Sequence, residues 1–317
     1  MESILLFRWG GLGDLLVSLP SLFFVRKKFP SLRLTLVCRQ EYGSLLKDTG
    51  IVDEVVSGSD ASLAPLFADS SDVQSELARW LKEFSLILGW MQKESSLPIE
   101  EHFLNQGAKN FRFFACDSTQ SSQISKFFFE KTAEFIGEGY TLKVAFEECQ
   151  FLPLNRDQKE EGLKLVGSDS DKSERIVVVH PGSGSEKKCW PLKNFLEIIF
   201  SLSRKGIRGA LVTGEAEERM RKEIEKTALP RGWQWILNPP LLKLAGLLSE
   251  SSLYLGNDSG ITHLAAASGT KVLALFRKDL ECIWKPYGNS VLLSAPSLDE
   301  ISPAAVWAKV TSLLELS

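Results

Sequence analysis

Short apolar segments alternate with longer segments of helical spacing along almost the whole chain, and this alternation constrains the fold more than any other feature. The apolar segments have the length and hydrophobicity of buried strands. They lie at 3–8, 32–38, 52–58, 84–90, 110–116, 175–184, 209–215, 253–258 and 271–276. Strands that alternate with helices are typical of a doubly wound parallel sheet. The sequence therefore predicts an α/β protein.

A composition break divides this pattern in two. Residues 155–175 are polar and end in a run rich in Ser, Asp and Lys, and the alternation restarts after them. A chain of 317 residues is long enough for two domains. We expect one α/β domain over 1–155 and a second over 156–317. A final helix is predicted near 302–316, because Ser302 and Pro303 are typical of an N-cap and a first turn.

Composition excludes several classes of function. The net charge of −3 gives no basic field that would recruit nucleic acid. Five scattered cysteines (Cys38, Cys116, Cys149, Cys189, Cys282) form no CxxC pair, which argues against zinc and fits a reducing compartment. The apolar N-terminal run is too short for a signal peptide, and no stretch has the length of a membrane span. We expect a cytoplasmic protein.

The loop after the first predicted strand carries an acidic residue where phosphate-binding loops carry none. Residues 7–16 read FRWGGLGDLL, which ends in Leu16 where a dinucleotide fingerprint has its third glycine, and a Walker A lysine is also missing. One interpretation makes Asp14 a helix N-cap, a role that asparagine would fill equally well with little change in stability. The other makes Asp14 a catalytic group.

Two loops in the second half have the chemistry of a diphosphate site. HPGSGSEKKCWP (180–191) combines Gly/Ser turns, Ser183 among them, with Lys188, although a basic surface loop anchored by Trp190 is the alternative. GNDSGITHLAAASGT (256–270) starts a helix near Ser259 or Gly260, whose free N–H groups suit an anion. Asp258 would cap this helix or bind sugar hydroxyls, and His263 would contact phosphate or the core.

The three loops together resemble glycosyltransferase family 9, the ADP-heptose:lipopolysaccharide heptosyltransferases. The family begins with a strand, a glycine turn, Gly-Asp and a later proline, which match Gly13, Asp14 and Pro20. Its Lys-x-Trp-Pro motif matches residues 188–191, and its Asp-Ser/Thr-Gly-x-x-His motif matches residues 258–263. Order and spacing agree from end to end, so the resemblance covers nearly all of the chain.

The resemblance implies a GT-B fold, in which two Rossmann-like domains face each other across a cleft. The first domain would bind a lipopolysaccharide core acceptor of the lipid A–Kdo type, and the second would bind ADP-heptose. The C-terminal helix would pack back toward the first domain. The reaction would move heptose with inversion, and it would need no metal and no other cofactor.

The resemblance also implies roles for single residues. Asp14 would be the catalytic base, with Gly11 and Gly13 on the acceptor side. The residues expected on the donor, its diphosphate, its sugar or its ribose are Ser183, Lys188, Glu217, Asp258, Ser259, Gly260 and His263.

Alternatives stay open at this point. The enzyme could use another nucleotide sugar or acceptor, act as an epimerase, or be a non-catalytic paralogue that binds nucleotide sugar. A NAD(P) oxidoreductase is disfavoured, because no acidic residue ends the second strand.

The family's acidic residue after the fourth strand is missing from 86–90, so the acceptor half diverges. Aromatic and basic residues at 23–29, 111–114 and 126–129 would suit contact with the inner membrane face, or would simply be core. We expect a monomer.

Overall fold

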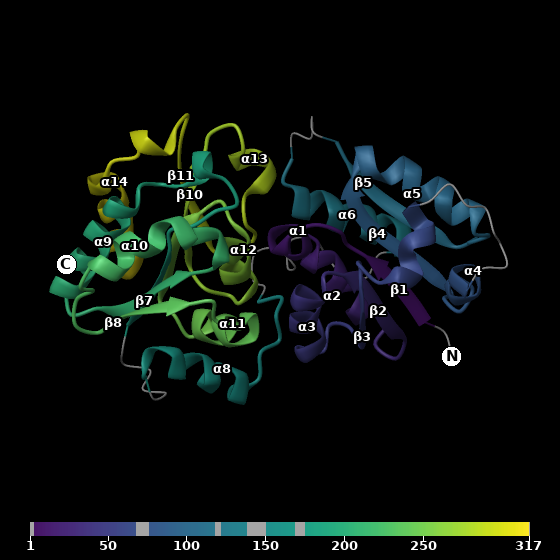
Figure 1. Cartoon of the computed structure of the whole chain (residues 1–317), viewed down its shortest axis with the longest axis horizontal. Helices are drawn as coiled ribbons and strands as arrows, with labels where there is room; N and C mark the ends of the chain where they lie inside the picture. The colour runs from purple at the N-terminus through teal and green to yellow at the C-terminus, as the bar shows by residue number, and fades with distance from the viewer. Residues whose placement is uncertain (1–2, 68–75, 118–121, 138–149, 169–174, 317) are drawn as a thin grey trace. The chain divides into compact units, whose positions relative to one another are not determined.

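The structure, a computed structural model, describes residues 3–67, 76–117, 122–137, 150–168 and 175–316. The chain divides into two compact units, residues 1–145 and 146–317 (Figure 1). The division falls in 138–149, which lies outside the described residues, as do Cys149 and the polar run 169–174. The polar stretch that begins at Asn155 starts with helix α8 (Arg156–Leu163), which belongs to the second unit.

The first unit is built on a five-stranded parallel sheet with the order β3-β2-β1-β4-β5. The central strand β1 is buried along its whole length, which explains its unbroken apolar sequence. All five strands were predicted from the sequence. Their bounds are β1 (Ser3–Phe7), β2 (Arg33–Cys38), β3 (Glu54–Ser57), β4 (Leu86–Gln92) and β5 (Phe111–Cys116).

Helices cover the sheet of the first unit on both faces, as Figure 1 shows. Pro20 stands in the first turn of the second helix, and Ser18 separates this helix from the first. The helices are α1 (Leu12–Val17), α2 (Leu19–Lys28), α3 (Gln40–Asp48), α4 (Glu76–Leu81), α5 (Lys93–Asn105) and α6 (Ile124–Ile136).

The aromatic and basic segments of the first unit mostly supply its core. Phe24, Phe113, Phe114, Phe128 and Phe129 are all buried. The core interpretation is therefore confirmed for these phenylalanines, and only their less buried neighbours remain at the surface.

The second unit is built on a six-stranded parallel sheet with the order β11-β10-β9-β6-β7-β8. Counted from its own first strand, this is the doubly wound order 3-2-1-4-5-6 read from β8 to β11. Four strands were predicted, whereas the two edge strands β8 and β11 were not. The strands are β6 (Ile176–His180), β7 (Arg208–Thr213), β8 (Trp233–Leu237), β9 (Leu253–Asn257), β10 (Val272–Arg277) and β11 (Ser290–Ala295).

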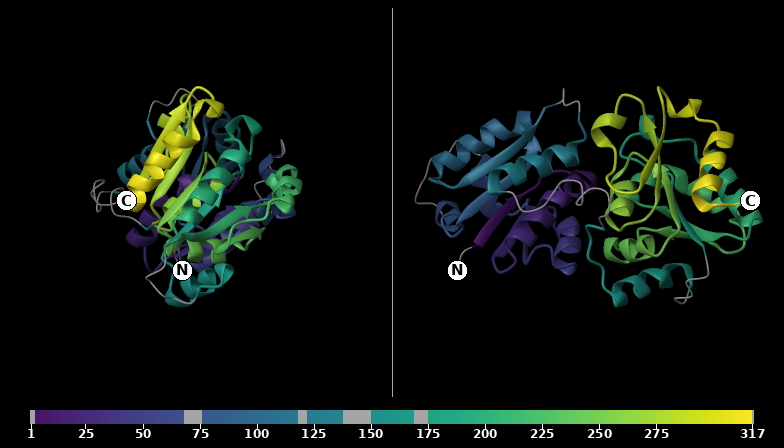
Figure 2. Two further views of the ribbon diagram at one scale, coloured as in Figure 1. Left: turned by 90° about the vertical axis from the view of Figure 1, so that its left-hand side faces the viewer. Right: turned by 180° about the vertical axis from the view of Figure 1, so that it is seen from behind.

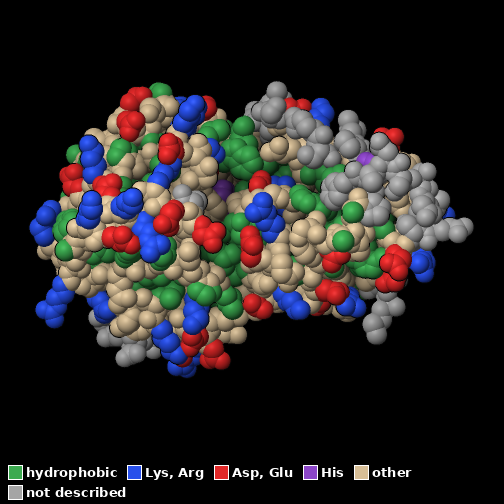
Figure 3. Space-filling model, viewed as in Figure 1, with side chains coloured by type: hydrophobic (Ala, Val, Ile, Leu, Met, Phe, Trp, Pro, Cys, Tyr) green, Lys and Arg blue, Asp and Glu red, His purple; other side chains and the backbone are tan. Residues whose placement is uncertain are grey.

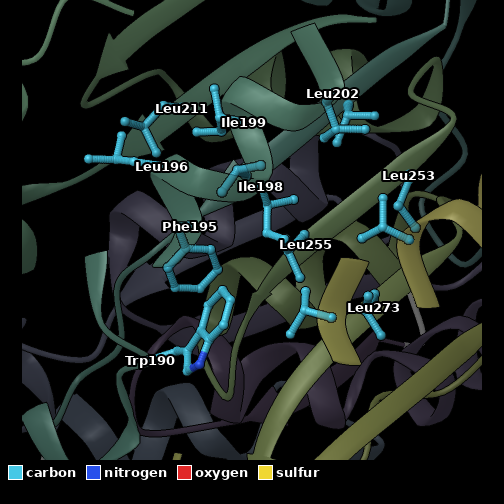
Figure 4. Packing of buried hydrophobic residues seen from close by; sticks show 14 of the residues in the cluster. Trp190, Phe195, Leu196, Ile198, Ile199, Leu202, Leu211, Leu253, Leu255 and Leu273 are labelled. Carbon is cyan, nitrogen blue, oxygen red and sulfur yellow. The ribbon is translucent and has the colours of Figure 1, made fainter. Parts of the chain in front are cut away.

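The core of the second unit gathers under α9 (Leu192–Arg204). Figure 4 shows the Trp190 ring edge-on to Phe195, and their centroids are 4.9 Å apart. Helix α8 packs so tightly on α11 (Leu241–Ser249) that a Cβ on Gly162 would lie 2.1 Å from the backbone nitrogen of Leu247. The remaining helices are α10 (Glu218–Lys226), α12 (Gly260–Ala267), α13 (Glu281–Trp284) and α14 (Pro303–Leu314).

The C-terminal helix α14, yellow in Figure 2, packs beside α9 through Val306, Val310 and Leu314. Its N-cap is Ser302, whose hydroxyl accepts a hydrogen bond from the Ala305 N–H at 3.2 Å, as the sequence indicated. A reach of this helix toward the first domain stays a prediction.

The surface carries interspersed charges. On the face shown in Figure 3, basic and acidic side chains alternate over the described parts of both units, in keeping with the small net charge. Among the described residues, no helix is long and apolar enough to cross a membrane.

Candidate active site

Each sheet has one point where the strand order reverses, between β1 and β4 in the first unit and between β6 and β9 in the second. Ligands of open α/β sheets bind at the carboxyl ends of the strands at this point. The loops at 8–14, 181–191 and 258–259 start at these carboxyl ends. The predicted site residues, apart from Glu217 after β7, thus belong to the two reversal points.

The loop after β1 is shaped around the Asp14 carboxylate. Gly10 has φ +124°, a conformation that favours glycine, and a Cβ on it would lie 2.5 Å from Asp14 Oδ2. Gly11 is the N-cap of α1, Gly13 lies in its first turn, and Asp14 is the third helical residue. The interpretation of Asp14 as the N-cap is therefore wrong. Its Oδ2 instead accepts a 2.8 Å hydrogen bond from the Gly11 N–H one turn back.

Arg8, which the sequence analysis missed, is the main partner of Asp14. Its guanidinium Nη2 donates to Asp14 Oδ1 at 3.2 Å, and its Nε donates to the Asp14 backbone oxygen at 2.6 Å. Its Nη1 donates to the Trp90 carbonyl at 3.0 Å, and the Phe128 ring lies 5.6 Å from the guanidinium. Arg8 is only 4% exposed, whereas the Asp14 side chain is 34% exposed.

Arg8 keeps its positive charge although it is buried. Burial lowers the pKa of Arg8, and the charge of Asp14 opposes this effect. Arginine nonetheless stays protonated in proteins. The guanidinium is buried and the carboxylate is partly exposed. Of this pair, the carboxylate is therefore the group that a ligand can reach.

In the second unit, helix α12 begins at the carboxyl end of β9. Ser259 is its N-cap, and the Ser259 hydroxyl accepts from the Thr262 N–H at 3.4 Å. Gly260 is the first helical residue, so its N–H belongs to the first turn, where helix amides lack intrahelical partners. Asp258 lies just before the cap and does not form it. His263 is buried one turn into the helix.

The loops after β6 and β9 are joined through Asp258. Lys188 Nζ lies 2.7 Å from Asp258 Oδ2, and the Ser183 hydroxyl donates to the Asp258 carbonyl oxygen at 2.7 Å. The Lys188 side chain is 32% exposed and the Asp258 side chain 8%. The structure therefore brings these three predicted residues together, with the lysine at the surface of the group.

Trp190 anchors the same loop in the core. Its indole N–H donates to the Ile301 carbonyl at 2.8 Å, and its backbone N–H donates to Asn257 Oδ1 at 3.1 Å. The Asn257 amide in turn donates to the Pro181 carbonyl at 2.7 Å. The packing role proposed for Trp190 is confirmed. The same anchor fixes the chain two residues after Lys188. Asn257 was not predicted; its only signal in the sequence is a polar residue ending an apolar strand.

Glu217 is paired with a histidine that the sequence analysis did not single out. Glu217 Oε2 lies 3.7 Å from His180 Nε2, and both side chains are buried. It also accepts from the Gly214 N–H at 2.7 Å. Burial alone would raise the pKa of Glu217, but the His180 ring and the backbone N–H of Gly214 outweigh burial and lower it.

His180 links this pair to the start of α12. Its Nδ1 lies 3.4 Å from the Ser259 hydroxyl oxygen. A Cβ on Gly182 would lie 1.8 Å from Glu217 Oε1, so the glycine allows the carboxylate to approach the loop. Glu217 is thereby connected to Ser259 only through the His180 ring, and its carboxylate faces protein groups.

A solvent-open pocket of about 360 Å³ borders the lysine loop within the second unit. Its lining includes Glu186, Lys187 and Cys189 on one side and residues 296–299 on another. Burial raises the pKa of the Cys189 thiol to about 11, so this cysteine is a weak nucleophile. Lys188 itself does not line this pocket, which therefore lies beside the lysine and not around it.

Comparison with known proteins identifies the family. The model of glycosyltransferase family 9 (heptosyltransferase) matches residues 126–300, more than half of the chain. This chain belongs to glycosyltransferase family 9. The resemblance found in the sequence is confirmed, and the protein is a glycosyltransferase. The matched residues include the Lys188 and Asp258 motifs but not the Asp14 loop.

A curated relative matches a smaller part of the chain than the family model does. Lipopolysaccharide heptosyltransferase 3 of Escherichia coli is 27% identical over 128 residues, or 38% of this chain. The match spans little more than a third of that relative, 36% of its length.

Solved structures of low sequence identity share the fold over whole chains. A glycosyltransferase of family 9 from Veillonella parvula superposes with a TM-score of 0.75 at 17% identity, covering 99% of this chain and 98% of that one. The E. coli ADP-heptose lps heptosyltransferase II gives a TM-score of 0.72 at 16% identity, with the same coverage. The predicted GT-B type fold, with two parallel-sheet α/β domains, is confirmed.

Proposed function

We propose that this enzyme transfers a heptose from ADP-heptose to a lipopolysaccharide core acceptor with inversion at the anomeric carbon. Family membership supports the reaction class, and a solved relative of the same fold is an E. coli heptosyltransferase with ADP, at a TM-score of 0.67 and 16% identity over 98% of this chain and 99% of that chain. The observation that carries the proposal is the position of Lys188, paired with Asp258 beside the start of α12 at the reversal point of the second sheet.

The donor diphosphate would bind at this reversal point. Lys188 is a cation one-third exposed, so it can turn from Asp258 to a phosphate oxygen without leaving a deep core. The first two amides of α12, those of Gly260 and Ile261, precede the N–H groups that bond to Ser259, and they would favour the same anion together with the helix dipole. Ser183 would keep Asp258 in place. We propose Glu217 for the ribose and His263 for the sugar and phosphates.

Asp14 would act as the general base. In the transfer step, the acceptor hydroxyl gives its proton to the Asp14 carboxylate while its oxygen bonds to the anomeric carbon, and the bond from that carbon to the ADP oxygen breaks. Negative charge then grows on the ADP, where Lys188 and the start of α12 stabilise it. These groups supply the charge stabilisation, so we propose that no metal or other cofactor takes part.

The acceptor assignment concerns the first unit. Gly11 and Gly13 add no side chains of their own beside Asp14, which would allow a sugar hydroxyl to come close. A lipid-linked acceptor would place the enzyme in the cytoplasm, at times against the inner membrane face, and we propose that it works as a monomer.

Calorimetry with ADP, ADP-heptose and UDP-GlcNAc tests the donor. UDP-GlcNAc is the matched alternative, because a solved UDP-GlcNAc 2-epimerase from Neisseria meningitidis shares the fold at a TM-score of 0.58 and 12% identity. We expect ADP-heptose to bind and to be consumed when truncated lipopolysaccharide cores are added. Preference for UDP-GlcNAc, or binding of ADP-heptose without transfer to any core, would contradict the proposal.

A further inference from the structure

We propose that Arg8 is the positioning residue of the active site, acting through Asp14. The inference rests on the proposed role of Asp14 as base, and it assigns a function to a buried cation that the sequence motifs do not include. The guanidinium fixes the direction of the carboxylate, so that one side of it stays turned toward the acceptor.

The guanidinium is anchored without help from the carboxylate. Its Nε and Nη1 donate to two backbone carbonyls, those of Asp14 and Trp90, at 2.6 and 3.0 Å. One of these carbonyls belongs to α1 and the other to β4, so Arg8 spans the reversal point of the first sheet. The Phe128 ring lies 5.6 Å from the guanidinium carbon. A side chain held at three places, and 4% exposed, has little freedom to follow a moving partner.

The carboxylate, by contrast, is held by one hydrogen bond on each oxygen. Oδ1 accepts from Arg8 Nη2 at 3.2 Å, and Oδ2 accepts from the Gly11 N–H at 2.8 Å. Two donors in fixed positions define the plane of the carboxylate, and each oxygen keeps a second lone pair. Because Asp14 is 34% exposed, those lone pairs remain available to a hydroxyl.

A second arginine in the same unit provides a matched control. Arg26 Nε donates to the Ile51 carbonyl at 3.0 Å, its Nη1 donates to the Leu32 carbonyl at 3.1 Å, and its Nη2 donates to Asp53. Asp53 also accepts from a backbone N–H, that of Leu34, at 2.7 Å. The arrangement is similar to that of Arg8 and Asp14, although both donors reach Asp53 Oδ2. It lies at the amino ends of β2 and β3, the opposite edge of the sheet.

The test measures kcat at saturating donor and acceptor, donor affinity and the urea midpoint for Arg8→Gln, Arg8→Lys and Arg26→Gln. We expect Arg8→Gln to lower kcat about 10- to 100-fold, since a misplacement on the order of 1 Å can cost about 100-fold, with donor affinity near wild type. Arg26→Gln should lower the urea midpoint and leave kcat within about twofold, as expected for additive effects at separate sites. Full kcat in both Arg8 variants would overturn the inference.

Combining these variants with Asp14→Asn separates the inference from the proposed function. If Arg8 acts through Asp14, adding Arg8→Gln to Asp14→Asn should leave kcat where Asp14→Asn alone puts it. Independent, multiplying losses would overturn the positioning role. Wild-type kcat in Asp14→Asn would overturn the base itself, and the inference with it. If Arg8→Gln does not fold, Arg8→Lys decides: lysine keeps the charge but lacks the planar fork, so kcat should still fall about tenfold or more.

Discussion

Replacing Lys188 by glutamine should weaken ADP binding strongly, and the structure allows the effect to be estimated. Glutamine keeps much of the length of the side chain and removes its charge. Lys188 Nζ lies 2.7 Å from Asp258 Oδ2, and under the proposed function its partial exposure would let it also reach a phosphate. The perturbation would therefore remove the one charge-assisted contact that we propose between Lys188 and the diphosphate, and it leaves the loop anchored by Trp190.

The magnitude follows from the environment of the lysine. Two unit charges 4 Å apart attract by about 4 kcal/mol at an effective dielectric of about 20. Lys188 is 32% exposed, so solvent screens part of this attraction. A net contribution of about 1.5–3 kcal/mol, the usual value for a hydrogen bond to a charged group, is the better estimate. It corresponds to ADP binding that is about 10- to 150-fold weaker.

The neighbouring lysine makes the control. Lys187→Gln removes the same charge one residue away, from an exposed side chain, and should weaken ADP binding by less than about threefold at physiological salt, because exposed charges are screened. Isothermal titration calorimetry of both variants, with the urea midpoint as a check on folding, measures the difference. Equal weakening in the two variants would refute the specific contact and leave only a general field effect.

Two further predictions concern stability. Asp14→Asn should lower the free energy of unfolding by about 1–3 kcal/mol, because buried Arg8 loses its counter-charge; a change below about 0.5 kcal/mol in urea unfolding would contradict the pairing. Glu217 has a lowered pKa in the folded protein, so its ionised form stabilises the fold above the ordinary glutamate pKa of about 4.3, and this contribution disappears as pH falls through the lowered value. The stability difference between wild type and Glu217→Gln should therefore be larger at pH 7 than at pH 3, and a constant difference would show that the charge does not matter.

Much of the fold could be predicted because buried parallel strands have continuous apolar sequences. Strands β1 and β6, buried along their whole length, were found from hydrophobicity alone. The edge strands β8 and β11 were missed, and their pairing depends on neighbours distant in sequence. Partial burial does not by itself explain the omission, because the partly buried edge strand β3 was predicted. Helix α8 was not predicted within the polar stretch 155–175, although Asn155 and Gln158 form a capping box that is visible in the sequence.

The candidate site was predictable only where motifs mark it. Lys188, Asp258 and Ser259 were found because each lies in a recognisable loop after an apolar strand. Arg8 could not be found in this way, because its role depends on the Trp90 carbonyl, 82 residues further along the chain. A contact between a side chain and a backbone oxygen far along the chain produces no recognisable residue pattern in the sequence.

Each unit has a cation near the reversal point of its own sheet, Arg8 in the first and Lys188 in the second. The two cations differ in exposure, and this difference fits the different roles that we propose for them. In the first unit, Arg8 joins the loop after β1 to the end of β4; in the second, Lys188 joins the loop after β6 to Asp258 at the end of β9. Arg8 is 4% exposed and locked by two carbonyls, so it can orient a partner but cannot exchange it. Lys188 is 32% exposed and bound through one carboxylate, so a diphosphate can compete for it. A buried cation would suit the proposed base, whose direction must not change, and an exposed cation would suit the proposed leaving group, which must enter and depart.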